Sequence, residues 1–175
     1  MGLCDGDSCQ FRRAVNELID KHYGDVYKYL SRKTGDSVLA EDLSQEVFIK
    51  FFTNIDKYTD RGRLKQYLIK IAVNVSNDYF RRRKITHSID ETTYEADCDF
   101  DNIDGIIIKH EMSLKIKAAV NQLPQYQRDV IILRYFHDMD LKTIASVTDT
   151  NISSVKSRLR QGQLKLYKLL KEDYV

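Results

Sequence analysis

The residues with the clearest chemical use are four consecutive cations, Arg81 to Lys84, which end the segment LKQYLIKIAVNVSNDYFRRRK. On a helical wheel of about 100° per residue, polar side chains before them share one face: Arg63, Lys70, Asn74, Asn77 and Arg81. Cations neutralise phosphates, and amides hydrogen-bond base edges. The stripe therefore predicts a nucleic-acid contact, and a solvated helix face is the alternative.

The same segment carries an apolar face, which we expect to pack on a core: Leu64, Tyr67, Leu68, Ile71, Ala72 and Val75. The preceding segment, AEDLSQEVFIKFFTNIDKY, places apolar residues at four-residue steps, and Phe48 and Phe52 widen that face. Acidic residues accompany them, which suits a basic protein surface better than DNA. An ordinary core helix with a solvated acidic edge explains the pattern equally well.

A second helical block begins after Pro124, which should open a helix through QYQRDVIILRYF. A short helix, a turn at 148–150 and a long helix from about Ile152 follow, with Asn151 as a good N-cap. Val155, Leu159, Leu166 and Leu169 form the inner face, while Ser153, Lys156, Ser157, Arg160 and Gln161 point away. This order predicts a helix–turn–helix whose second helix reads a major groove. A helical protein-interaction bundle is the alternative.

Charge is segregated along the chain. Eight Lys or Arg stand against one acid between residues 61 and 84, and seven against one between 142 and 171. The stretch 88–105 holds seven acids and no Lys or Arg, which predicts an extended linker; a loop packed on one domain is the alternative. A net charge of only +2 thus conceals two basic blocks. We expect an all-α protein with two small helical domains joined by an acidic flexible linker.

Other functional classes find little support in the composition. We find no phosphate loop, nucleophile elbow, paired carboxylates or metal-ligand spacing, so we expect no enzyme, metal or cofactor. Cys4, Cys9 and Cys98 lack paired spacing and are interpreted as reduced thiols. No apolar run is long enough to span a bilayer, and no signal peptide opens the chain, so we expect a cytoplasmic protein without membrane insertion.

AEDLSQEVFIKFF, LKQYLIKIAVNVSNDYFRRRK and the block from LPQYQRDV to LKLYKLL resemble conserved regions two and four of extracytoplasmic-function (ECF) sigma factors, in the family's order and spacing. These are small specificity subunits of bacterial RNA polymerase. The resemblance covers about residues 10–172 and implies an N-terminal tail (1–9), a region 2 domain (10–86), a linker (87–110) and a region 4 domain (111–175).

The resemblance also implies contacts. The clamp helices of the largest polymerase subunit would bind a set of six residues: Asp42, Gln45, Glu46, Phe48, Ile49 and Phe52. The flap of the polymerase would be a second contact. The loop DKYTDRGRL would hold an extruded base of the −10 element, and Asn74 would contact a base. The −10 set is Arg61, Arg63, Lys70, Asn74, Asn77, Arg81, Arg82, Arg83 and Lys84. The −35 set is Ser153, Ser154, Lys156, Ser157, Arg158, Arg160 and Gln161.

The chain departs from the family pattern at the turn, where Asp149 and Thr150 replace glycine followed by an apolar residue. Aspartate tolerates the left-handed conformation better than most residues. No sensor domain is evident, so an anti-sigma factor is the expected regulator. Two other interpretations stay open: a stand-alone helix–turn–helix regulator, and a helical protein-interaction module. A stand-alone regulator would give no function to the block around Asn74. A protein-interaction module would give no function to the cations Arg81 to Lys84.

Overall fold

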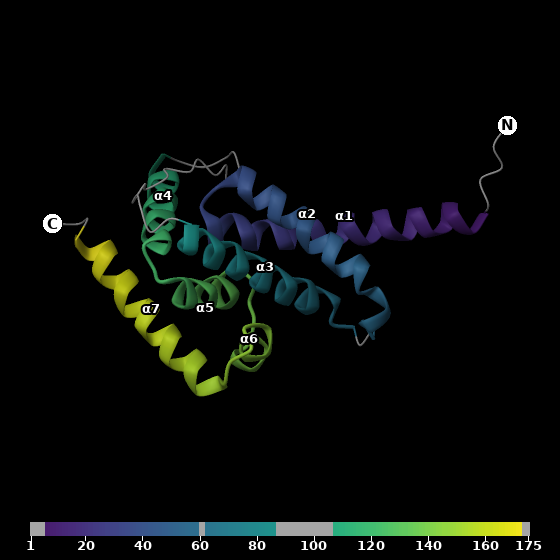
Figure 1. Cartoon of the computed structure of the whole chain (residues 1–175). Coiled ribbons are helices and arrows are strands. Elements are labelled where there is room, and N and C mark those ends of the chain that lie inside the picture. The colour runs from purple at the N-terminus through teal and green to yellow at the C-terminus, as the bar shows by residue number, and fades with distance from the viewer. Residues whose placement is uncertain (1–5, 60–61, 87–106, 173–175) are drawn as a thin grey trace.

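The computed structural model describes residues 6–59, 62–86 and 107–172, and its regular elements there are helical (Figure 1). The N-terminal half contains α1 (Gly6–Thr34), α2 (Ser37–Thr53), the short 3-10 helix η1 (Ile55–Lys57) and α3 (Leu64–Thr86). The C-terminal half contains α4 (Ile107–Asn121), α5 (Gln125–Tyr135), α6 (Leu141–Val147) and α7 (Ile152–Glu172). The all-α fold class predicted from the sequence is confirmed.

Helices α1, α2 and α3 pack on one another in the N-terminal half. The α1–α2 turn needs Gly35, whose φ is +74° and whose added Cβ would meet the Asn121 side chain at 2.9 Å. Asp36 then caps α2, because its carboxylate accepts a hydrogen bond from the Leu39 amide at 3.1 Å. The tight turn thus folds α2 back along α1.

The C-terminal half contains the predicted helix–turn–helix. Pro124 stands directly before α5, and the turn between α6 and α7 places Asp149 at φ 49°. The Asn151 side chain accepts a 2.7 Å hydrogen bond from the Ser154 amide, and α7 begins at Ile152. The helix after Pro124, the left-handed aspartate, the N-cap and the start of the long helix are all confirmed.

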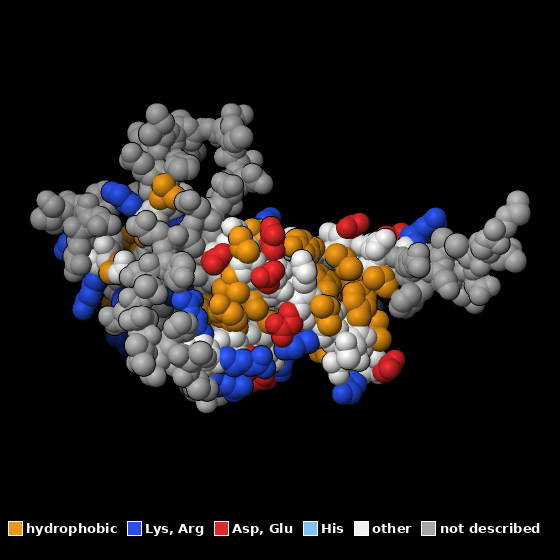
Figure 2. All heavy atoms as spheres, turned by 45° about the horizontal axis from the view of Figure 1, so that its top comes forward, with side chains coloured by type: hydrophobic (Ala, Val, Ile, Leu, Met, Phe, Trp, Pro, Cys, Tyr) orange, Lys and Arg blue, Asp and Glu red, His pale blue; other side chains and the backbone are white. Residues whose placement is uncertain are grey.

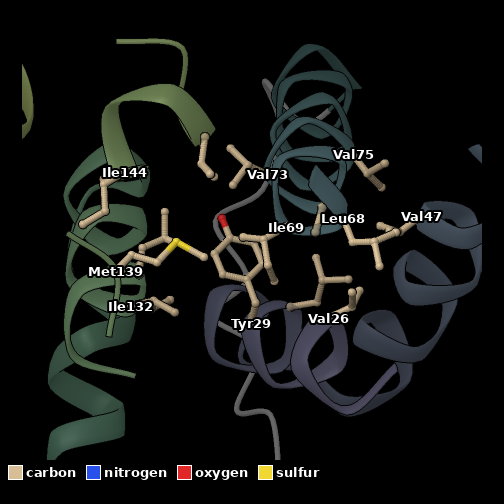
Figure 3. Close-up of a cluster of buried hydrophobic side chains, with 14 of the residues drawn as sticks. Val26, Tyr29, Val47, Leu68, Ile69, Val73, Val75, Ile132, Met139 and Ile144 are labelled. Carbon is tan, nitrogen blue, oxygen red and sulfur yellow. The ribbon is translucent and has the colours of Figure 1, made fainter. Parts of the chain in front are cut away.

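One hydrophobic core joins the two halves (Figure 3). Helix α3 is buried on two sides rather than on the one apolar face predicted. Leu68 lies near Val47 of α2, whereas Ile69 and Val73 lie toward Met139 and the C-terminal half. Ile71, which the predicted face included, is only partly buried. The interface between α1–α3 and α4–α7 is called the seam below.

The predicted linker falls largely outside the described residues, as do Cys4 and Cys98. Helix α4 begins at Ile107, inside the range 87–110 interpreted as linker. No helix in the described part of the chain is long and apolar enough to span a bilayer.

Candidate nucleic-acid interface

The polar stripe of α3 lies on one side of that helix. Arg63, Asn74, Asn77 and Arg81 are exposed, and Lys70 is half-buried. Arg81 pairs with Asp78 one turn earlier at 2.9 Å, which pre-orders its guanidinium near the helix end. The amides and cations therefore share a surface suited to phosphates and base edges. Of the predicted −10 set, Arg61 and the side chain of Lys84 lie outside the described residues.

Two members of this stripe are bonded to other elements. Lys70 Nζ lies 2.5 Å from Asp149 Oδ1, which belongs to the turn of the helix–turn–helix. Asn77 accepts a 2.8 Å hydrogen bond from Lys33 Nζ of α1. Packing of the two halves therefore engages Lys70, and packing of α1 on α3 engages Asn77, while Asn74 stays exposed.

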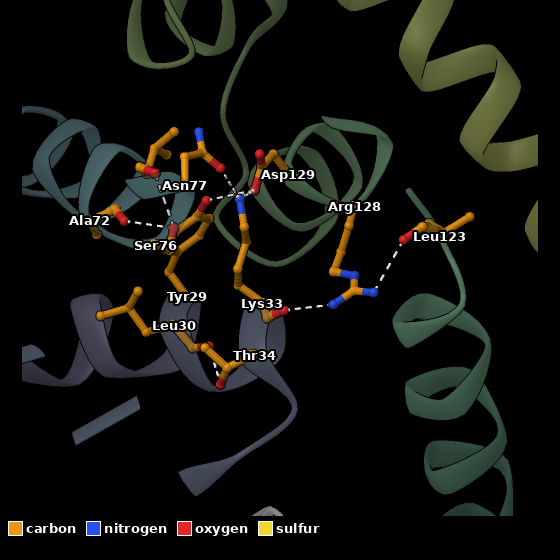
Figure 4. Close-up of polar contacts among 11 residues, drawn as sticks. Tyr29, Leu30, Lys33, Thr34, Ala72, Ser76, Asn77, Leu123, Arg128 and Asp129 are labelled. Atoms are coloured by element: carbon orange, nitrogen blue, oxygen red, sulfur yellow. Dashed lines mark hydrogen bonds and ion pairs between the residues drawn. The ribbon is translucent and has the colours of Figure 1, made fainter. Parts of the chain in front are cut away.

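A buried polar network crosses the seam beside this surface (Figure 4). The Lys33 ammonium contacts the Asp129 carboxylate, and the Tyr29 hydroxyl donates to the same Asp129 oxygen at 2.7 Å. Arg128 adds a 2.7 Å hydrogen bond to the Lys33 carbonyl. Burial lowers the pKa of Lys33 against the opposing effect of Asp129, and burial together with Asp129 raises that of Tyr29. A buried charge needs such partners.

His137 follows α5 and also faces the seam. Its ring lies 6.0 Å from that of Tyr29 in an edge-on arrangement, and both its nitrogens are buried with no hydrogen-bond partner among the described residues. Burial, followed by the charge of Lys65, lowers its pKa from 6.5 to about 4. The packed form therefore holds a neutral imidazole.

The outward face of α7 carries the predicted −35 residues. Ser153, Lys156, Ser157 and Arg160 are exposed, while Val155 is fully buried beneath them. The remaining three are less available: Ser154 is half-buried, Arg158 lies over the Tyr126 ring at 5.6 Å, and Gln161 accepts a hydrogen bond from Gln127 at 3.2 Å. Together with Gln161, which is also exposed, the first four make a polar surface with two cations, which suits a major groove.

The outer side of α2 carries the residues predicted to bind polymerase. Asp42 and Gln45 are exposed, and Ile49 is 65% exposed. Glu46 pairs with Lys50 at 2.7 Å. Phe48, in contrast, is only 5% exposed and stacks on Tyr23, so it supports the surface from beneath. Phe52 is partly buried and packs edge-on against Phe51. On the face shown in Figure 2, hydrophobic side chains lie beside acidic ones.

Sequence reasoning missed the seam residues Lys33, Asp129 and His137. A lysine or an aspartate on a helix reads as a solvated residue unless its partner is known, and Lys33 and Asp129 are 96 residues apart. No periodic signal in the sequence could have paired them. No cluster of three or more metal-ligating side chains is found in the part of the chain that the structure describes.

Two family models match the chain in this order: Sigma-70 region 2 over residues 18–85, and Sigma-70 region 4 over residues 113–166. The first match contains the α2 surface and the α3 stripe. The second contains the helix–turn–helix and the α7 face.

The chain is similar over most of its length to two proteins of Bacillus subtilis. It is 30% identical to the ECF RNA polymerase sigma factor SigX over 164 residues, covering 89% of this chain and 84% of SigX. It is 27% identical to SigW, with coverages of 91% and 90%. Its fold matches the sigma factor RpoE solved with the anti-sigma factor NepR from Bartonella quintana (TM-score 0.75, 21% identity, coverages of 89% and 96%). It also matches CnrH solved with the cytosolic domain of CnrY (TM-score 0.65, 21% identity, coverages of 93% and 90%).

Proposed function

The chain belongs to the ECF RNA polymerase sigma factors, and we propose that its α3 stripe and its α7 face divide promoter recognition between them. Such a subunit directs core RNA polymerase to promoters, and it is a transcription factor rather than an enzyme. We place its activity in the bacterial cytoplasm, where polymerase and promoter DNA are found. The observation that carries the division of labour is two exposed polar surfaces, around Asn74 on α3 and around Lys156 on α7.

The α3 stripe is assigned to the −10 element. Asn74 is exposed and carries the donor and acceptor pair that a base edge requires. Arg81, Arg82 and Arg83 follow it within three turns of the same helix and would hold the phosphates upstream. Because Lys70 is paired with Asp149 across the seam, its use in the stripe requires the C-terminal half to move away from α3. Asn77 is held by Lys33 of α1, within the N-terminal half, so this contact must break separately.

The α7 face is assigned to the −35 element. The N-terminal residues of the second helix of a helix–turn–helix contact base edges. Here these are Ser153, Lys156 and Ser157, with Arg160 one turn further. Asn151 fixes the start of this helix and therefore the direction in which these side chains point.

The outer face of α2 is assigned to the clamp helices of the polymerase. Exposed Ile49 supplies apolar contact, and Asp42 supplies negative charge toward a basic partner. An anti-sigma factor is the expected regulator, because the anti-sigma factor NepR accompanies RpoE, a sigma factor of similar fold.

Run-off transcription tests the proposal. The purified chain is added to core polymerase and fragmented DNA of the host, and the transcript starts are mapped. New starts that share two spaced upstream elements are the expected result. A chain that binds DNA but forms no complex with the core polymerase would instead favour a stand-alone regulator.

A further inference from the structure

A groove runs along the seam where α3, together with residues 57–59 and Arg63, faces α6. Its largest hollow has a volume of about 740 Å³, within the range of small-molecule sites. Lys57, Arg63 and Lys70 line it from the N-terminal half, and Lys142 lines it from the C-terminal half. Two adjoining hollows of about 660 and 500 Å³ share lining residues with it, Lys70 and Ser146 in one case and Arg63 and Asp140 in the other. The groove therefore exists only while the halves are packed together.

The groove gathers positive charge from both halves. Among the described residues, the four cations and one acid, Asp140, line its largest hollow, and the adjoining hollows add Lys65, Asp138 and Asp149. Asp140 is also the cap of α6, since it accepts a 2.8 Å hydrogen bond from the Thr143 amide. Within the described residues, Lys70 pairs with Asp149, and no carboxylate forms an ion pair with Lys57, Arg63 or Lys142. Like charges brought together at a seam repel, so a multivalent anion placed between them would stabilise the packed form.

The other lining groups suit a phosphate ester. Thr143 and Ser146 supply hydroxyl donors from α6. Tyr58 and Tyr67 lie on the opposite wall with ring centroids 4.9 Å apart, and both are partly buried. Aromatic rings of this kind can contact the face of a nucleobase. We propose that this groove binds a linear polyphosphate anion, either free or as the phosphate chain of a nucleotide, when the two halves are packed together.

Such a ligand would act on both halves at once. Since its site is complete only in the packed form, binding favours that form by mass action. Arg63 and Lys70 belong to the stripe assigned to the −10 element, so the ligand and promoter DNA would compete. That consequence for transcription depends on the proposed function, whereas the binding itself does not.

Isothermal titration calorimetry of the whole chain with inorganic tripolyphosphate is the direct test. Binding with one site per chain is expected. Lys142→Ala should weaken it by about tenfold, the usual loss for one hydrogen bond to a charged group, and Lys142→Arg should restore it. Lys142 is exposed and lies outside the predicted DNA contacts, so its substitution leaves the fold and both DNA surfaces intact. Lys168→Ala, an exposed cation of α7 outside the groove, is the matched control and should bind as the unaltered chain does.

Two further arms identify the ligand and the state that binds it. Asp129→Ala removes no groove residue, yet it should abolish binding because it separates the halves; circular dichroism checks that its helices persist. GTP that binds more tightly than tripolyphosphate would identify a nucleotide site, and equal affinity would identify a phosphate-chain site. Guanosine should not bind in either case.

Equal weakening by Lys142→Ala and Lys168→Ala, or full binding by a folded Asp129→Ala chain, would overturn the proposal, because both results describe general attraction of polyanions to a basic surface. No heat of binding by either probe would overturn it as well. None of these results depends on polymerase. Failure of the groove and failure of the promoter assignment are therefore distinguishable.

Discussion

The ammonium group of Lys33 lies against the carboxylate of Asp129, and both side chains are almost completely removed from solvent at 0% and 6% exposure. Lys33 belongs to α1 and Asp129 to α5, so the pair joins the two halves of the chain. A buried pair of opposite charges stabilises a fold no more than apolar residues of the same shape would. A single buried charge without its partner, in contrast, strongly destabilises the fold. The pair therefore makes packing of the halves depend on both partners being present.

Asp129→Ala should open the seam. It leaves Lys33 buried without its partner, at a cost of about 3–5 kcal/mol in the packed form. Separation of the halves returns Lys33 to water, so the cost should appear as opening rather than as unfolding. Small-angle X-ray scattering should show a larger radius of gyration with unchanged helix content. The double variant Lys33→Met with Asp129→Leu should stay compact, and an equally expanded double variant would contradict this account.

Acid should loosen the packed form through His137. Its pKa is 6.5 when solvated and about 4 in the packed chain, so only the open or unfolded chain takes up a proton between these values. Stability is therefore complete above pH 6.5 and falls progressively as the pH drops toward 4, by at most about 3 kcal/mol. The charges facing the ring are Lys65 and Asp25, together with Arg32 and Asp138.

Thermal melting of the unaltered chain and of His137→Phe between pH 8 and pH 4 measures this effect. The difference between the two curves should grow below pH 6.5, because phenylalanine takes up no proton. Parallel curves over the whole range would exclude His137 as the source.

Asn74→Ala should reduce discrimination at the −10 element. Loss of one amide contact to a base edge costs about 1–3 kcal/mol, or roughly tenfold to hundredfold in preference. Stability and polymerase binding should not change, because the side chain is exposed. Run-off transcription on promoters with single −10 substitutions provides the measurement. A variant that still distinguishes those promoters as the unaltered chain does would remove Asn74 from base recognition.

Reversal of Arg82 and Arg83 to glutamate should weaken binding to all promoters alike. Each phosphate contact removed lowers the dependence of log affinity on log salt by about one unit. Affinities measured for the polymerase complex at several salt concentrations give this slope. The same substitutions should leave the ranking of −10 sequences unchanged, and an unaltered slope would place both residues away from the phosphates.

Two substitutions on α2 should have different effects: Ile49→Glu should impair polymerase binding, and Phe48→Ala should lower stability. Ile49 is 65% exposed, so the glutamate should abolish polymerase binding without changing stability. Phe48 is 5% exposed, so its truncation should lower the free energy of unfolding by about 3–5 kcal/mol. Denaturant unfolding and a pull-down of core polymerase report the two properties. Normal polymerase binding by Ile49→Glu would move the contact elsewhere.

Patterns within single helices were readable from the sequence. The start of α7, its Asn151 cap and the left-handed Asp149 follow from local rules that involve neighbouring residues. Similarly, the α3 stripe could be assigned to one face because its amides and cations recur at helical spacing. Such features require no knowledge of what packs against the helix.

Contacts across the seam could not be read in the same way. Periodicity assigns one buried face to a helix, whereas α3 buries Leu68 toward α2 and Val73 toward the C-terminal half. Lys33 and Asp129 follow no apolar pattern at all, because their burial depends on a partner about one hundred residues away along the chain. From one sequence, a charged residue that is buried against a distant partner cannot be told apart from a charged residue in solvent.

The hydrophobic core that passes through the seam has a consequence for how the chain melts. Because Ile69 and Val73 belong to the same buried cluster as Ile132 and Met139, neither half can lose its packing without exposing apolar surface of the other. We therefore expect the isolated chain to melt as a single cooperative unit, with equal calorimetric and van't Hoff enthalpies. Once the seam opens, the same sequence becomes two independent units, each with its own melting temperature.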